Sequence, residues 1–284
     1  MTADGVRPRA VRVLTALLAA TAAATAGVEL LNYWYAPEHG YSLAVRTGWA
    51  LVRTLGWLIL IWHVGRARAV SRPLGLILAV TTVFAVGRLI VPRAGAPPLP
   101  GLIGFGVLAA LCLTVVVLLY RHPTLQDHLV RHPNRLVFTR GGLAWQEAVP
   151  RRAPVRGWLV TARVSAFTYS PLMLVPCLIA VGELQDKPQY LLAVIFWFGA
   201  GACASYVVLL TTFFLLRGKS FARRALVWIS LGVLAVDLPL CYLLLGVDGL
   251  VRDGAPLLAA VLLTVYAVWR THRTAAGEAD AVAA

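Results

Sequence analysis

The chain has 284 residues, of which 60% are hydrophobic and only 13% are charged. Soluble domains carry about 25% charged residues, so this composition, with a mean hydropathy of +0.77, excludes an ordinary water-exposed surface. We predict that the lipid bilayer is the main partner of the chain. The net charge of +14 does not indicate nucleic-acid binding, because the arginines occupy short segments between apolar runs rather than one basic face.

Eight apolar runs approach the roughly 20 residues that a helix needs to cross a bilayer. The sequence therefore predicts an all-α, polytopic integral membrane bundle, with residues 1–284 forming a single transmembrane domain. Most connections between the runs are short, as between antiparallel neighbours, and the polar segment 121–157 is the exception. The predicted spans are 11–33, 43–64, 73–91, 99–120, 158–182, 190–216, 225–246 and 254–270.

The basic residues between these spans alternate between the two sides of the membrane. Nineteen arginines and lysines fall on the side of the N-terminus, and four fall on the other side. The positive-inside rule then places both termini and segment 121–157 in the cytoplasm. The abundance of arginine and alanine is typical of GC-rich genomes, so we expect a multi-pass protein of a bacterial plasma membrane.

The N-terminal run has two interpretations. Basic residues followed by LTALLAATAAATA fit a cleavable signal peptide as well as a first span. We favour an uncleaved helix because further spans follow. The stretch VRVLTALLAATAAATAGVEL also resembles the sequence after residue 154, which would correspond to a four-plus-four internal repeat. Any two apolar helices share this much similarity, and we favour chance.

Arg53 lies near the middle of the second predicted span. At 1.5 Å per residue it is about 15 Å from either surface, which is too far for its side chain to reach water. Trp49 and Trp57 stand four residues to each side of Arg53. We therefore predict an arginine that faces the bundle interior and that these two rings contact by cation–π interaction.

Asp237, Glu29 and Arg88 are further ionisable residues within the predicted spans. Asp237 lies at the same depth in the seventh span, and an isolated charge there costs about 2.5–3.5 kcal/mol. We therefore expect Arg53 and Asp237 to be close, with Glu29 and Arg88 forming a second pair near the outer ends of their spans. Two interpretations stay open: the pairs either fix helix packing or line a functional polar pocket.

The segment RHPTLQDHLVRHPNR, residues 121–135, brings three histidines together. His128 and His132 have the spacing of one helix face, and His122 precedes them, but the surrounding arginines disfavour a divalent cation. We expect no metal there. Pro123 and Pro133 frame a short basic helix, which we expect to lie on the membrane surface or to bind a cytoplasmic protein.

The fifth span contains FTYSPLMLVPC, in which Pro171 and Pro176 each remove a backbone donor. Tyr169 and Ser170 precede the first proline, so their hydroxyls fall where the helix is expected to kink. Kinked helices often line substrate sites in transporters. We therefore include Tyr169 and Ser170 in the candidate network with Glu29, Arg53, Arg88, Asp237, Trp49 and Trp57.

No nucleotide, haem, zinc or flavin motif is found, and the four cysteines fall in apolar runs as small hydrophobic residues. We expect no cofactor. The first functional hypothesis is a permease-like protein that binds a charged or hydrophobic small molecule. The alternative is a cofactor-independent membrane enzyme that acts on a lipid or hydrophobic metabolite. A third is a sensor or assembly subunit, which predicts no cavity around Arg53.

Overall fold

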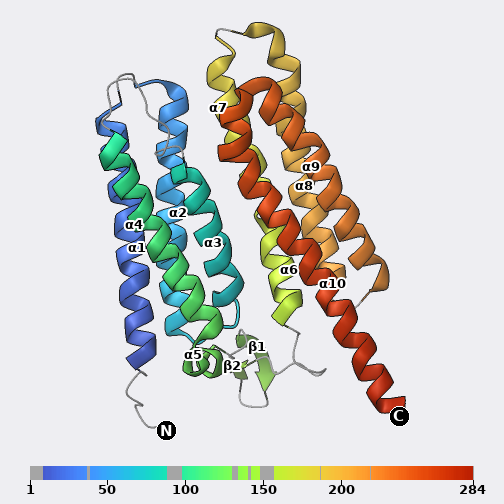
Figure 1. Cartoon of the computed structure of the whole chain (residues 1–284). Helices are drawn as coiled ribbons and strands as arrows, with labels where there is room; N and C mark the ends of the chain where they lie inside the picture. The colour runs from blue at the N-terminus through green and yellow to red at the C-terminus, as the bar shows by residue number, and fades with distance from the viewer. Residues whose placement is uncertain are drawn as a thin grey trace.

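The structure is a computed structural model, and it describes most of the chain. The described residues are 9–36, 39–87, 98–129, 134–139, 142–147, 157–185, 187–217 and 219–283. Long helices run side by side in two groups, with the polar segment between the two groups at the end where both termini lie (Figure 1). We call α1 to α5 the N-terminal half and α6 to α10 the C-terminal half.

The N-terminal half is a ring of four helices. Each helix packs against the next, and α4 packs back against α1. Their apolar faces enclose a core that includes Leu14, Leu18, Trp57, Leu60 and Leu119. The helices are α1 (Arg9–Trp34), α2 (Tyr41–Gly65), α3 (Ser71–Val86) and α4 (Pro98–Arg121).

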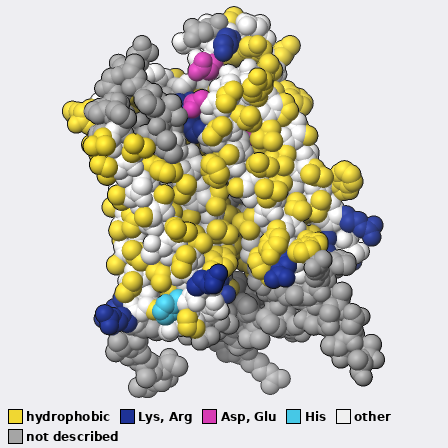
Figure 2. Space-filling view, in the orientation of Figure 1, with side chains coloured by type: hydrophobic (Ala, Val, Ile, Leu, Met, Phe, Trp, Pro, Cys, Tyr) yellow, Lys and Arg dark blue, Asp and Glu magenta, His cyan; other side chains and the backbone are white. Residues whose placement is uncertain are grey.

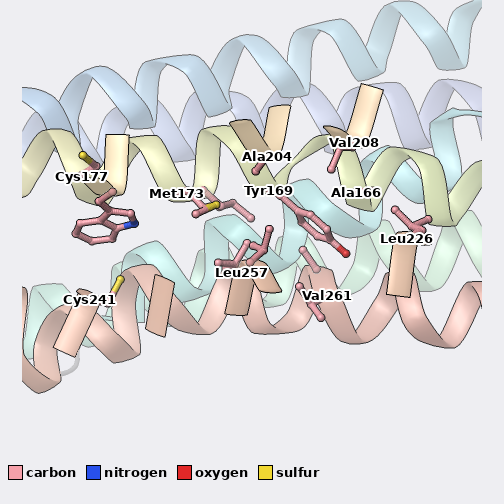
Figure 3. Packing of buried hydrophobic residues seen from close by; sticks show 14 of the residues in the cluster. Ala166, Tyr169, Met173, Cys177, Ala204, Val208, Leu226, Cys241, Leu257 and Val261 are labelled. Atoms are coloured by element: carbon pink, nitrogen blue, oxygen red, sulfur yellow. The ribbon is translucent and has the colours of Figure 1, made fainter. Parts of the chain in front are cut away.

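The C-terminal half repeats this arrangement around a second core. Figure 3 shows Tyr169, Met173, Leu257 and Val261 converging in that core from α7 and α10. In this half α7 packs on α8, α8 on α9, α9 on α10, and α10 on α6. The elements are α6 (Gly157–Phe167), α7 (Tyr169–Glu183), η2 (Pro188–Tyr190), α8 (Leu191–Leu216), α9 (Ser220–Gly249), η3 (Leu250–Gly254) and α10 (Ala255–Ala283).

The expected irregularity of the fifth span is a break between α6 and α7 at Thr168. The Thr168 hydroxyl donates to the Ser165 carbonyl oxygen at 2.6 Å. Pro171 has no N–H to donate to the turn before it, and the helix is interrupted in that turn. Pro176, by contrast, is accommodated inside α7.

The chain reverses between α9 and α10. The helical stretch Ser220–Thr271 has 52 residues, which would extend about 78 Å if it were straight, far beyond a hydrocarbon core of about 30 Å. Gly246 has φ 70° and ψ −162°, a conformation open mainly to glycine. This residue and the π-helical turn η3 bend the chain, so that α10 returns along α9 (Figure 1).

Among the described residues, six helical stretches are long and apolar enough to cross a membrane, and the shorter α3 is apolar too. Their outward faces carry large hydrophobic side chains, such as Leu192 with 78% exposure, and Figure 2 shows them over the middle of the molecule. The prediction of a helical membrane bundle fits these findings. Each predicted span also coincides with described helix, except that residues 88–91 of the third lie outside the described residues.

The polar segment differs from its prediction in two respects. The helix α5 (Pro123–His128) begins at Pro123 as expected, but it ends before Pro133. An unpredicted antiparallel hairpin follows, in which β1 (Asn134–Thr139) pairs with β2 (Gly142–Glu147). The all-helical prediction therefore missed these two short strands.

The position of α5 also corrects the expectation of a helix on the membrane surface. Its apolar residues Leu125 and Leu129 are buried in the core of the N-terminal half. The Arg72 guanidinium donates to the Gln126 carbonyl oxygen at 2.8 Å, and the Gln126 amide donates to the Tyr120 carbonyl oxygen at 2.6 Å. These contacts hold α5 against the ends of α3 and α4, so its apolar edge stabilises the bundle.

Candidate functional site: a polar pocket between the two halves

The two halves meet along α2 and α3 on one side and α6, α7 and α10 on the other. Their clusters of fully buried apolar residues are separate, and Trp49 of α2 packs against the C-terminal cluster across the interface. One close approach joins α2 to α7: the Ser42 hydroxyl donates to the Ile179 carbonyl oxygen at 3.3 Å. A Cβ atom on Gly182 would lie 2.6 Å from the same hydroxyl, so a larger residue there would displace the Ser42 side chain.

A pocket of about 30 Å³ lies in this interface, room for about two water molecules. We call it the polar pocket because five charged residues line it: Glu29, Arg46, Arg53, Arg252 and Asp253. They come from α1, α2 and η3. The rest of the lining is Trp49, Thr81, Ala85, Leu172, Val175, Pro176, Ile179 and Pro256.

Arg53 and Glu29 form an ion pair across α2 and α1. The Arg53 Nη2 and Glu29 Oε1 atoms are 3.6 Å apart, and both side chains are 3% exposed. The Arg53 guanidinium carbon also lies 5.8 Å from the centre of the Trp49 ring, which confirms one predicted cation–π contact. Trp57 has another role, because its indole N–H donates to the Thr82 hydroxyl at 3.3 Å inside the core.

Arg252 is a site residue that sequence reasoning missed. It was counted as a residue of an outer loop, but its side chain is only 5% exposed. It donates to Asp248 Oδ2 at 2.7 Å and to Asp253 Oδ2 at 2.9 Å. The π-helical turn η3 turns Arg252 toward the protein, and the only signal in the sequence was the four-residue spacing from Asp248.

The expected pairing of Arg53 with Asp237 is replaced by different partners for each residue. Arg53 pairs with Glu29 at the interface. Asp237 is fully buried in the C-terminal half, where the Trp197 indole N–H donates to its Oδ1 atom at 2.9 Å and the Cys241 thiol lies 3.6 Å from Oδ2. Both side chains are buried, as their positions in the middle of the predicted spans indicated. Equal depth could not identify which helices are neighbours.

Arg88, which we expected to pair with Glu29, lies outside the described residues. Arg46 is the additional arginine that the structure brings into the polar pocket, from the first turns of α2. Arg46 lies near the outer end of the second predicted span, 43–64, and was not included in the predicted candidate network. Among the residues that the structure describes, the charged lining is three arginines and two acids, of which only Glu29 and Arg53 were predicted as site residues.

Tyr169 and Ser170 belong to hydrogen-bond networks within the C-terminal half. The hydroxyls of Tyr169 and Ser230 are 2.8 Å apart, and the Ser205 hydroxyl donates to Ser170. A related contact joins the hydroxyls of Thr264 and Ser165 at 2.8 Å. These groups satisfy one another between α6, α7, α8, α9 and α10, and α7 contributes other residues to the polar pocket, Leu172 and Pro176 among them.

Within the described part of the chain, no group of three His, Cys, Asp or Glu residues is placed to hold a metal ion. His128 lies at the end of α5, and His132 lies outside the described residues. Comparison with protein-family models, curated proteins and solved structures gave no match. The polar pocket is therefore the feature from which function is argued.

Proposed function

We propose that the chain is a multi-pass protein of a bacterial plasma membrane with eight crossings and with both termini in the cytoplasm. The reversal at Gly246 supports counting α9 and α10 as two crossings, and the apolar α3 supports an eighth. Basic side chains gather at the end of the molecule where the termini lie (Figure 2). The positive-inside rule assigns that end to the cytoplasm, so the polar pocket belongs to the outer half of the membrane.

The function we propose is binding of a small charged solute in the polar pocket, as in a permease. The observation that carries this proposal is a cavity lined by buried arginines and acids on the boundary between two separately packed halves. A purely structural role predicted no cavity around Arg53. Charged groups within a membrane are costly and are usually retained for function.

The arrangement of the halves suggests how a bound solute would be released. Many transporters expose a central site by rocking one helical bundle against another. Here the interface lies between two separate buried apolar clusters, so we take it as the hinge surface. The lining from α2, α3, α7 and η3 would separate when the halves move.

Cysteine labelling tests whether the polar pocket exchanges with water. Ala85→Cys places a thiol in the lining of the polar pocket, in a Cys203→Ala background, because Cys203 is the exposed native cysteine among those described. We expect a membrane-impermeant, negatively charged thiosulfonate to label it from the outside, and more slowly from the inside. Ala79→Cys, buried on the same helix, is the matched control and should stay unlabelled. Absence of labelling from both sides would contradict solute binding.

A further inference from the structure

A second, apolar pocket of about 10 Å³ adjoins the polar pocket between α3 and α10. The two pockets share Thr81 and Pro256. The apolar one continues along Ile77 and Val80 on α3 and along Ala259 and Leu263 on α10. Charged and hydrocarbon surfaces are therefore contiguous along one line of the interface.

The length of this line along the helices is comparable to the hydrocarbon thickness of one bilayer leaflet. Ala85 and Ile77 are eight residues apart on α3, and Pro256 and Leu263 are seven apart on α10, which gives about 10–12 Å along either helix. The hydrocarbon of one leaflet is about 15 Å thick. The charged end lies toward the helix ends opposite the two termini, and the apolar end points toward the bilayer middle, as in a lipid of that leaflet.

We infer that the two pockets together bind a lipid-type amphiphile, with an acidic phosphate headgroup in the polar pocket and a hydrocarbon tail between α3 and α10. This inference rests on the proposed function and specifies its ligand class. Among the described lining residues three arginines face two acids, and arginine recognises phosphate oxygens through its paired N–H groups. Asp248, which also bonds Arg252, has a mostly exposed side chain and lies outside the lining.

Small side chains make room for the tail. Ala259, Ala260 and Thr81 are small residues in the lining of the apolar pocket, where α3 faces α10. The pocket is narrow with the halves together, and a tail would part α3 from α10 while leaving each core intact. The ligand would reach the site sideways from the outer leaflet, with its headgroup at the level of Arg46 and Arg252.

Native mass spectrometry of the full chain in a neutral maltoside detergent tests this inference. The probes are hexadecyl phosphate, hexadecanol and inorganic phosphate at equal concentrations. We expect hexadecyl phosphate to bind at least tenfold more tightly than either of the other two. Equal binding of hexadecyl phosphate and hexadecanol would overturn the headgroup assignment, and equal binding of hexadecyl phosphate and inorganic phosphate would overturn the tail assignment.

Two variants separate failure of this inference from failure of the proposed function. Ala259→Phe fills the apolar pocket and should weaken the binding of hexadecyl phosphate at least tenfold, without changing the binding of inorganic phosphate. Leu262→Phe, on the exposed face of α10, is its control and should change neither. Arg46→Gln should weaken both phosphate ligands. Binding of hexadecyl phosphate that is insensitive to Ala259→Phe contradicts the tail site alone, and no binding of any probe contradicts both proposals.

Discussion

The two halves of the molecule share one packing plan but treat their polar residues differently. Each is a ring of helices around its own apolar core. The C-terminal half satisfies buried polar groups internally, through Tyr169 with Ser230 and Asp237 with Trp197. The N-terminal half directs its buried ion pair, Glu29 with Arg53, toward the interface. The difference teaches that the described ion pairs lie where the halves meet, and that side-chain hydrogen bonds serve the interior of the C-terminal half.

Of the substitutions that test this difference between the halves, Arg53→Leu is expected to lower the free energy of unfolding most. The variant removes the cation that faces the buried Glu29 carboxylate, and loss of one partner of a buried pair costs about 3–5 kcal/mol. The double variant Glu29→Gln with Arg53→Leu should recover much of that loss, because no isolated charge is left. The free energy of unfolding in mixed micelles measures both. Single and double variants of equal stability would show that the pair is not coupled.

A smaller effect is expected from Asp237 in the C-terminal half. Asp237→Leu leaves the buried Trp197 indole N–H without its acceptor, at a cost of about 1–3 kcal/mol. Asp237→Asn retains a carbonyl oxygen at the same position and should be close to the original chain. The same unfolding measurement compares them. If Asp237→Asn lowers the free energy of unfolding as much as Asp237→Leu does, the negative charge of Asp237 stabilises this half and its interior is not neutral.

The smallest effect is expected from the hydroxyl contacts. Thr264→Val removes the donor to Ser165, which joins α10 to α6, and a buried hydrogen bond contributes about 0.5–1.5 kcal/mol. Thr212→Val is the matched control, because the Thr212 hydroxyl bonds only to carbonyl oxygens of its own helix. We expect the control to change stability less than Thr264→Val. The reverse order would show that contacts between α6 and α10 are not stabilising.

Local patterns in the sequence predicted much of the fold. Hydrophobic run length located the helices, Pro123 marked the start of α5, and the four-residue spacing of Trp49 and Arg53 predicted their contact. The hairpin was missed because three-residue apolar runs around Gly141 are too short to distinguish a strand from a loop.

The candidate site was predicted only in part, because its geometry depends on which helices are neighbours. Depth in the membrane correctly identified Glu29 and Arg53 as buried charges. It could not show that α1 lies beside α2 at this level, which is what gives Arg53 its partner. Arg252 was assigned to a loop because nothing local in the sequence specifies the π-helical turn that buries it.

The most direct test of a ligand site between the two halves is an experimental structure in nanodiscs made from native membrane without detergent. We predict elongated density that starts among Arg46, Arg53 and Arg252 and continues between α3 and α10 to Leu263. The contrary result would be α3 and α10 in continuous side-chain contact, with the three arginines bridged only by protein acids and with no density between the halves.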